Sequence, residues 1–185
     1  MTASPTERRF DARRVAELAL LTALSLLAGY VEGLLPPVLP MIPVRLGLAN
    51  VFSLFALLRR GRGDALAVAL LRCPLLALVA GRVSQLFFSL AGGLLAWGAM
   101  AALLPLYRCG RVGAVGLSVA GAFCFNVGQL AVGCAAAGPS MAAYLPWMGL
   151  LSIPAGAATG LLAALLDARL PHPPPHGSGQ SDAPV

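Results

Sequence analysis

The chain alternates between long runs of apolar residues and short stretches that are polar or rich in proline. A helix that crosses a bilayer needs about 20 mostly apolar residues. On this basis the pattern predicts six membrane spans, at residues 15–35, 44–58, 65–80, 83–104, 112–137 and 144–166. The second and third are short for a full crossing and also fit a re-entrant pair, which leaves both chain ends on the same side. We therefore predict an all-α integral membrane protein, built as a bundle of six transmembrane helices.

Polar segments flank this membrane domain at both ends. The first residues are like the basic region of a signal peptide, but the apolar run at 15–35 is longer than a signal core. Residues 171–185 are rich in proline, glycine and polar side chains, a composition that does not support a packed core. We expect a basic N-terminus at 1–14, a membrane domain at 15–170 and a disordered tail at 171–185.

The arginines beside the predicted spans are distributed unequally between the two sides. Ten lie on the side of the chain ends, and only Arg45 and Arg82 lie on the other side. Cytoplasmic loops of membrane proteins carry the excess of positive charge. The distribution therefore places both termini in the cytoplasm of a multi-pass protein of the cell membrane.

Composition excludes several classes of function. The chain is 58% hydrophobic, has a net charge of +6, and its 13 basic side chains are all arginine. Without a lysine it has no Walker A loop, so any nucleotide-driven step must come from a partner. The arginines are split among short loops, which argues against nucleic acid as a partner. The four cysteines are far apart and the two histidines lie in the tail, so we expect no metal and no cofactor.

Strongly polar side chains inside the predicted spans gather in the outer half of the bundle, beneath the proline-rich stretch at 36–43. They are Glu32, Arg45, Asn50, Arg72, Arg82, Gln85, Asn126 and Gln129. An ionisable residue in a membrane costs about 2.5–3.5 kcal/mol on insertion scales and by default marks a functional site or a paired charge. The group predicts an outward-open cavity of net positive charge, covered by 36–43 as a lid, that binds an anionic solute.

A structural interpretation of each residue remains open beside the functional one. Arg72 would then pair with Glu32, or cap carbonyl groups at the bend before Pro74. The amide side chains would form hydrogen bonds between helices. Arg45 and Arg82 would be interfacial anchors whose charged ends reach the aqueous phase.

Small residues form stripes along three of the predicted helices. They are Ala16, Ala19 and Ala23 in the first, Gly92, Gly93 and Gly98 in the fourth, and Gly156, Gly160 and Ala164 in the last. Such stripes allow the close approach of another helix. That helix belongs either to the bundle itself or to a partner protein.

Several segments together resemble one family. They are ALLTALSLLAGYVEGLLP, PVRLGLANVFSLFALL, LLRCPLLALVAG, SQLFFSLAGGLLAW, FNVGQLAVG and YLPWMGLLSIPAGAATGLLA. The likeness covers residues 15–166 and is to the heptaprenyl diphosphate synthase component I family, also called Gx transporters. That family is similar to the substrate-binding S components of energy-coupling factor transporters, which are six-helix bundles.

The resemblance implies a partner surface and a pocket. In S components an AxxxA stripe on the first helix docks on the membrane coupling subunit, and Ala19 and Ala23 match that stripe. The pocket of those proteins opens outward beneath the loop that corresponds to 36–43. The pair Phe125–Asn126 departs from the pattern, because many relatives have a histidine before the asparagine.

The enzymatic part of the family name does not fit this chain acting alone. Prenyl elongation needs aspartate-rich clusters such as DDxxD, which hold magnesium on the diphosphate. The seven acids here are scattered, and no two lie within three residues of each other. We therefore expect no catalytic activity of its own.

Two hypotheses follow. In the leading one, the chain is a substrate-binding subunit for uptake of a small anionic or amphipathic solute, such as a vitamin-like compound, a flavin or a prenyl diphosphate, and is energised by a coupling subunit with ATPases. In the alternative, it is a non-catalytic membrane component of a heptaprenyl diphosphate synthase.

Overall fold

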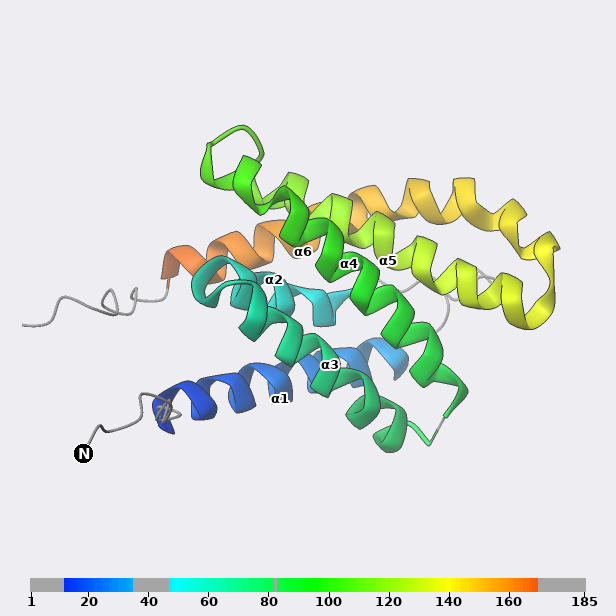
Figure 1. Ribbon diagram of the computed structural model, residues 1–185, viewed down its shortest axis with the longest axis horizontal. Helices are drawn as coiled ribbons and strands as arrows, with labels where there is room; N and C mark the ends of the chain where they lie inside the picture. The colour runs from blue at the N-terminus through cyan, green and yellow to red at the C-terminus, as the bar shows by residue number, and fades with distance from the viewer. Residues whose placement is uncertain (1–11, 35–46, 82, 170–185) are drawn as a thin grey trace, which may run out of the picture.

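The structure is a computed structural model that describes residues 12–34, 47–81 and 83–169. Within these ranges the chain forms α1 (Ala12–Leu34), α2 (Leu48–Arg60), α3 (Arg62–Val79), α4 (Ser84–Arg108), α5 (Ala114–Ala137), the 3₁₀ helix η1 (Pro139–Tyr144) and α6 (Leu145–Arg169), and it has no strand (Figure 1). The prediction of an all-α protein is confirmed. The predicted lid at 36–43, Arg45, Arg82 and the tail at 171–185 lie outside the described residues.

Within the described ranges, four stretches are long and apolar enough to cross a membrane: Arg14–Leu34, Ser84–Arg108, Ala114–Ala137 and Pro139–Arg169. The chain is therefore a multi-pass membrane protein. By contrast, α2 has 13 residues, which at about 1.5 Å per residue is shorter than the roughly 30 Å of hydrocarbon. The count of six complete crossings stays a prediction.

The short helix α2 lies at the centre of the bundle. It packs against α1, α3, α4 and α6, and Val51, Leu54 and Leu57 are each at most 1% exposed. These side chains share one core cluster with residues of α3, α4, α5 and α6. Because other helices surround α2, its burial does not depend on contact with lipid.

Glycines bring α4, α5 and α6 into close contact. A Cβ added at Gly128 of α5 would lie 2.7 Å from the carbonyl oxygen of Ala91 in α4. A Cβ at Gly156 of α6 would lie 2.6 Å from the Cα of Val119 in α5, and Gly160 is similarly close to α5. The small-residue stripe of α6 therefore packs inside the bundle. The stripe of α1 differs, because both of its predicted docking residues, Ala19 and Ala23, are exposed.

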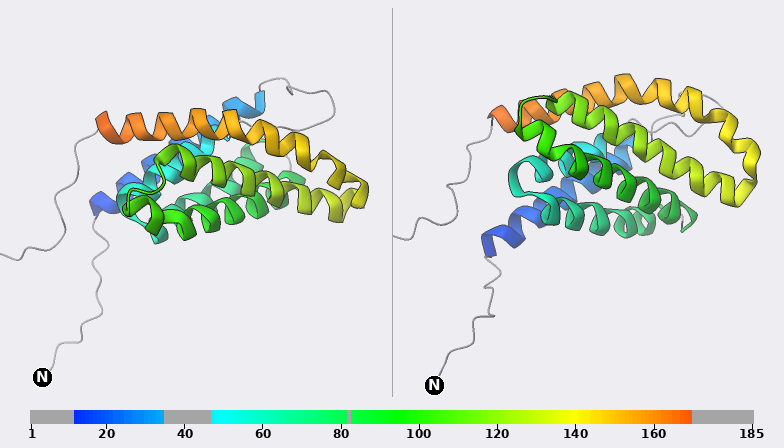
Figure 2. Two further views of the ribbon diagram at one scale, coloured as in Figure 1. Left: turned by 90° about the horizontal axis from the view of Figure 1, so that it is seen from above. Right: turned by 45° about the horizontal axis from the view of Figure 1, so that its top comes forward.

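The start of α1, the α2–α3 and α4–α5 connections and the end of α6 lie together at one end of the bundle, which we call the arginine end (Figures 1 and 2). Ion pairs gather there. The pairs are Arg14–Asp64, Arg60–Glu17 and Arg59–Asp167, the last with Nε and Oδ1 2.6 Å apart. They tie α1 to α3, α1 to α2 and α2 to α6. The placement of this end in the cytoplasm stays a prediction.

Candidate functional site

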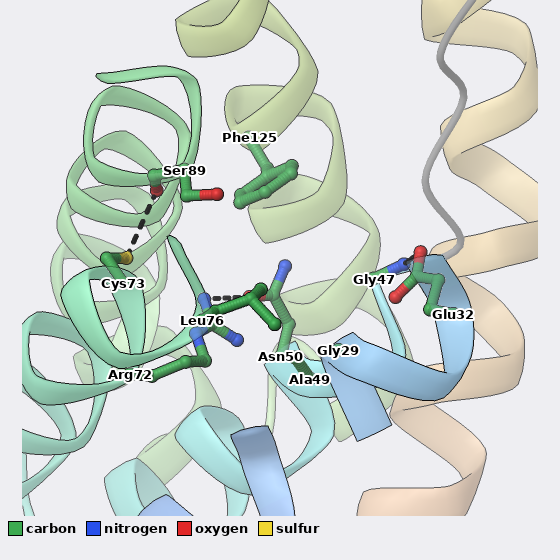
Figure 3. A pocket seen from close by; sticks show the side chains of 10 residues that line it. All are labelled: Gly29, Glu32, Gly47, Ala49, Asn50, Arg72, Cys73, Leu76, Ser89 and Phe125. Atoms are coloured by element: carbon green, nitrogen blue, oxygen red, sulfur yellow. Dashed lines mark hydrogen bonds between the residues drawn. The ribbon is translucent and has the colours of Figure 1, made fainter. Parts of the chain in front are cut away.

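A small pocket lies among α1, α2, α3, α4 and α5 (Figure 3). It is in the half of the bundle away from the arginine end, because its lining includes Glu32 near the end of α1 and Asn50 near the start of α2. Its lining residues are Gly29, Glu32, Gly47, Ala49, Asn50, Arg72, Cys73, Leu76, Ser89 and Phe125. The cavity measures roughly 20 Å³, which is room for about one water molecule. A ligand of vitamin size needs a pocket of about 300 Å³ or more. Such a ligand therefore requires lining groups to move.

Arg72 is the buried cation of this pocket and joins three helices. It is 4% exposed, and its Nη2 donates to Oδ1 of Asn50 at 3.0 Å. Its Nη1 lies 3.4 Å from the hydroxyl of Ser25, which itself donates to the Ala49 carbonyl at 2.9 Å. Among the described residues, no ion pair of 4 Å or less involves Arg72. Its direct partners are thus neutral groups of α1 and α2.

Glu32, near the end of α1, binds the start of α2. One carboxylate oxygen accepts a hydrogen bond from the Gly47 N–H at 2.7 Å, and the other accepts from the Leu48 N–H at 3.1 Å. The first N–H groups of a helix have no partner within the helix and carry its positive dipole end, so a carboxylate is favourable there. Gly47 has φ +74°, a left-handed conformation that glycine adopts without steric cost. Glu32 therefore fixes how α2 enters the bundle.

The predicted amide residues of α5 lie apart from this pocket. Asn126 is 4% exposed, and its Nδ2 donates to the Met148 carbonyl of α6 at 3.1 Å. This is the hydrogen bond between helices that the sequence offered as the alternative to ligand binding. Oδ1 of Asn126 and Oε1 of Gln129 are buried, and neither has a hydrogen-bond partner in the described part of the chain. Gln85, half-buried in the first turn of α4, does not line the pocket either.

The structure thus divides the predicted set. Arg72, Asn50 and Glu32 meet in one pocket, and Figure 3 shows Arg72 and Asn50 reaching toward each other with Glu32 beside Gly47. Asn126, Gln129 and Gln85 lie elsewhere, and the two outer arginines are outside the described residues.

Sequence reasoning missed the pocket residues Cys73 and Phe125, and also Ser25, which bonds Arg72. Cys73 donates from its sulfur to the Ser89 carbonyl at 3.4 Å and so links α3 to α4. One signal was available for Ser25, because Ser25, Gly29 and Glu32 are spaced i, i+4, i+7 and share one face of α1. Phe125 had no such signal within an apolar helix.

No group of three or more histidine, cysteine, aspartate or glutamate residues suited to a metal ion occurs in residues 12–34, 47–81 and 83–169. The acids of these ranges have other roles. Glu17, Asp64 and Asp167 pair with arginines at the arginine end, and Glu32 caps α2.

Comparison with known proteins identifies a family. The family model described as heptaprenyl diphosphate synthase component I matches residues 21–166. This range is more than half of the chain and includes every residue that lines the pocket. No curated protein and no solved structure matches the chain.

Proposed function

Because the chain belongs to the heptaprenyl diphosphate synthase component I family, we propose that it is the non-catalytic membrane component of such a synthase and works with a separate catalytic component. The observation that carries this proposal is the family match over residues 21–166. The acids support the same division of labour, because prenyl transfer needs clustered carboxylates for magnesium. In the described residues, Glu17, Asp64 and Asp167 are held in ion pairs with arginine, and Glu32 binds the start of α2.

A membrane component has a physical role in making a product with seven prenyl units. Each methylene group moved from water into an apolar environment is stabilised by about 0.8 kcal/mol, so the growing chain favours the bilayer over the aqueous phase. The helices present exposed apolar side chains such as Leu27, Leu78 and Leu161. A catalytic component bound at an aqueous end of this protein lies at the bilayer and releases its product directly into lipid.

Reconstitution tests this function. The aspartate-rich catalytic component is placed with liposomes that contain this chain, and incorporation of labelled isopentenyl diphosphate into long-chain product is measured. We expect substantial long-chain product only when both components are present. Liposomes that contain an unrelated multi-pass protein of similar size are the control. Full activity of the catalytic component without this chain would refute the proposal.

A second candidate function is the substrate-binding subunit of an uptake system for a small anionic solute, energised by a coupling protein and ATPases. The specific observation in its favour is Arg72, a buried cation in a pocket remote from the arginine end. The exposed Ala19 and Ala23 on α1 offer a surface for the coupling subunit. Vitamin-like compounds, flavins and prenyl diphosphates all carry groups that suit Arg72.

One variant separates the two functions. Arg72→Met removes the positive charge of Arg72 at similar length, and Arg62→Met removes an exposed arginine at the start of α3 as the matched control. If the chain captures an anion, Arg72→Met abolishes binding of flavin mononucleotide or farnesyl diphosphate by the purified protein in nanodiscs, while Arg62→Met retains it. If the chain only supports the synthase, long-chain product forms equally well with both variants and neither compound binds the wild type.

A further inference from the structure

Two groups that attract anions meet in the pocket of Figure 3. One is the guanidinium of Arg72, which is 4% exposed. The other is the start of α2, where the N–H groups of Gly47 and Leu48 point to Glu32. Gly47 and Arg72 both line the cavity, so one bound anion would feel both. Helix N-termini and arginine side chains both bind phosphate and carboxylate groups favourably.

In this structure the carboxylate of Glu32 already takes the place of such an anion. Each of its oxygens accepts one N–H group from the start of α2, and Glu32 lines the same cavity as Arg72. We propose that Glu32 is the resident anion of the pocket, and that a phosphate, diphosphate or carboxylate ligand displaces it from the N-terminus of α2 and pairs with Arg72.

The contacts of Arg72 support displacement rather than a fixed structural pair. A guanidinium has five N–H donors, and those of Arg72 reach the neutral oxygens of Asn50 and Ser25. Glu32 contacts the backbone of α2 instead, and no ion pair of 4 Å or less joins it to Arg72 among those found in the described residues. A ligand oxygen that bonded Arg72 directly would gain a charge-assisted hydrogen bond that the present arrangement lacks.

The size and position of the site fit the same inference. The cavity holds about one water, so the pocket as it stands is closed to larger anions. Glu32 is half-buried and lies two residues from the end of α1, whereas Arg72 is buried in the middle of α3. Of the two charged groups, Glu32 is therefore the one that can turn outward to admit a ligand. The inference rests on anion capture at Arg72, which the second candidate function requires and the synthase function does not.

The test compares affinities for inorganic diphosphate and farnesyl diphosphate in nanodiscs. Glu32→Gln keeps an oxygen that can accept an N–H of α2 but removes the competing negative charge. Because the ligand then no longer competes with a carboxylate for the N–H groups of α2, we expect Glu32→Gln to bind diphosphate at least about tenfold more tightly than the wild type. Glu17→Gln is the matched control, since Glu17 pairs with Arg60 at the arginine end, and its affinity should equal that of the wild type. The double variant Glu32→Gln/Arg72→Met should lose the gain.

The two probes also distinguish the source of the anion. Equal gains with both indicate recognition of the diphosphate group alone, as in a soluble solute, while a gain confined to farnesyl diphosphate indicates a prenyl lipid. A wild type that binds diphosphate through Arg72 but gains nothing from Glu32→Gln would overturn the resident-anion inference and leave anion capture standing. Absence of binding by both proteins would overturn both and leave the synthase function to its own assay.

A measurement on the wild type covers the case in which Glu32→Gln does not fold. Displacement of Glu32 changes the hydrogen-bond partner of the Gly47 and Leu48 amides, so saturating diphosphate should shift their NMR resonances. Binding without such a shift would overturn the inference.

Discussion

The buried serines of α1 and α2 differ in what their hydroxyl groups reach. Ser25 is fully buried, donates to the Ala49 carbonyl and lies next to Arg72. Ser53 is 3% exposed, yet its hydroxyl has no hydrogen-bond partner in the described part of the chain. A buried polar group with a partner stabilises a fold, whereas one without a partner costs free energy. The same substitution should therefore act oppositely at these two positions.

Ser25→Ala should destabilise the protein by about 1–3 kcal/mol, because it removes a buried hydrogen bond to the Ala49 carbonyl and the hydroxyl next to Arg72. Ser53→Ala should leave stability unchanged or raise it by up to about 1 kcal/mol, since no hydrogen bond is lost. Equilibrium unfolding in detergent measures both. A loss at Ser53 as large as that at Ser25 would mean that the Ser53 hydroxyl has a partner after all.

Single residues of the site could be predicted where they are charged or amide side chains, because these are rare inside membrane spans. Arg72, Asn50 and Glu32 stand out because charged and amide side chains are costly inside a membrane, and all three line the pocket. Phe125 lines it too, but one more apolar side chain in an apolar helix carries no signal. Glu32 binds the start of α2 through a contact between residues 15 positions apart in the chain. The periodicity of polar residues within one helix does not predict such a contact.

At the scale of elements, hydropathy predicts α1, α4, α5 and α6 well and α2 poorly. Long helices that face lipid need unbroken apolar runs, so their sequence reveals them. The central α2 ends in Arg59 and Arg60, which pair with residues of α6 and α1. Its start was predicted at residue 44 and is observed at Leu48. Its place at the core is set by tertiary packing, which cannot be predicted from a count of apolar residues.

The contact between α4 and α5 depends on glycine at a position where backbone atoms meet. Gly128→Ala would place a Cβ within 2.8 Å of the Ala91 carbonyl group and the Gly92 Cα. Backbone atoms cannot give way as the end of a flexible side chain can, so we expect a loss of about 1–3 kcal/mol, typical of overpacking. Thermal unfolding in detergent measures this loss.

The matched control is Gly98→Ala in the middle of α4. A Cβ there meets no heavy atom within 4 Å, and alanine favours a helix over glycine by up to about 1 kcal/mol. Gly98→Ala should therefore leave stability equal or slightly higher. If Gly128→Ala also proved neutral, α4 and α5 would be farther apart than the structure shows.

At the scale of the whole molecule, charge divides the bundle into two unlike ends. The arginine end has exposed arginines at 62, 108, 111 and 169 beside the three ion pairs found in the described residues. The opposite end of the described chain has η1, the start of α4 and the Glu32 cap of α2. If the arginine end faces the cytoplasm, as charge distribution predicts, then the pocket lies nearer the exterior. The sidedness therefore bears directly on which of the two candidate functions the pocket serves.

A native cysteine reports this sidedness. Cys109 is exposed and follows Arg108 at the end of α4, whereas Cys73 is buried and Cys124 and Cys134 are half-buried. We expect a membrane-impermeant maleimide to label Cys109 in inverted vesicles and not in right-side-out vesicles. The variant Cys109→Ser should remove the signal, and adding Ser140→Cys in the exposed η1 should restore it with the opposite sidedness. Labelling of Cys109 from outside would place the arginine end at the exterior and the pocket nearer the cytoplasm. A pocket on that side would favour a ligand supplied by a cytoplasmic synthase over a solute captured from outside.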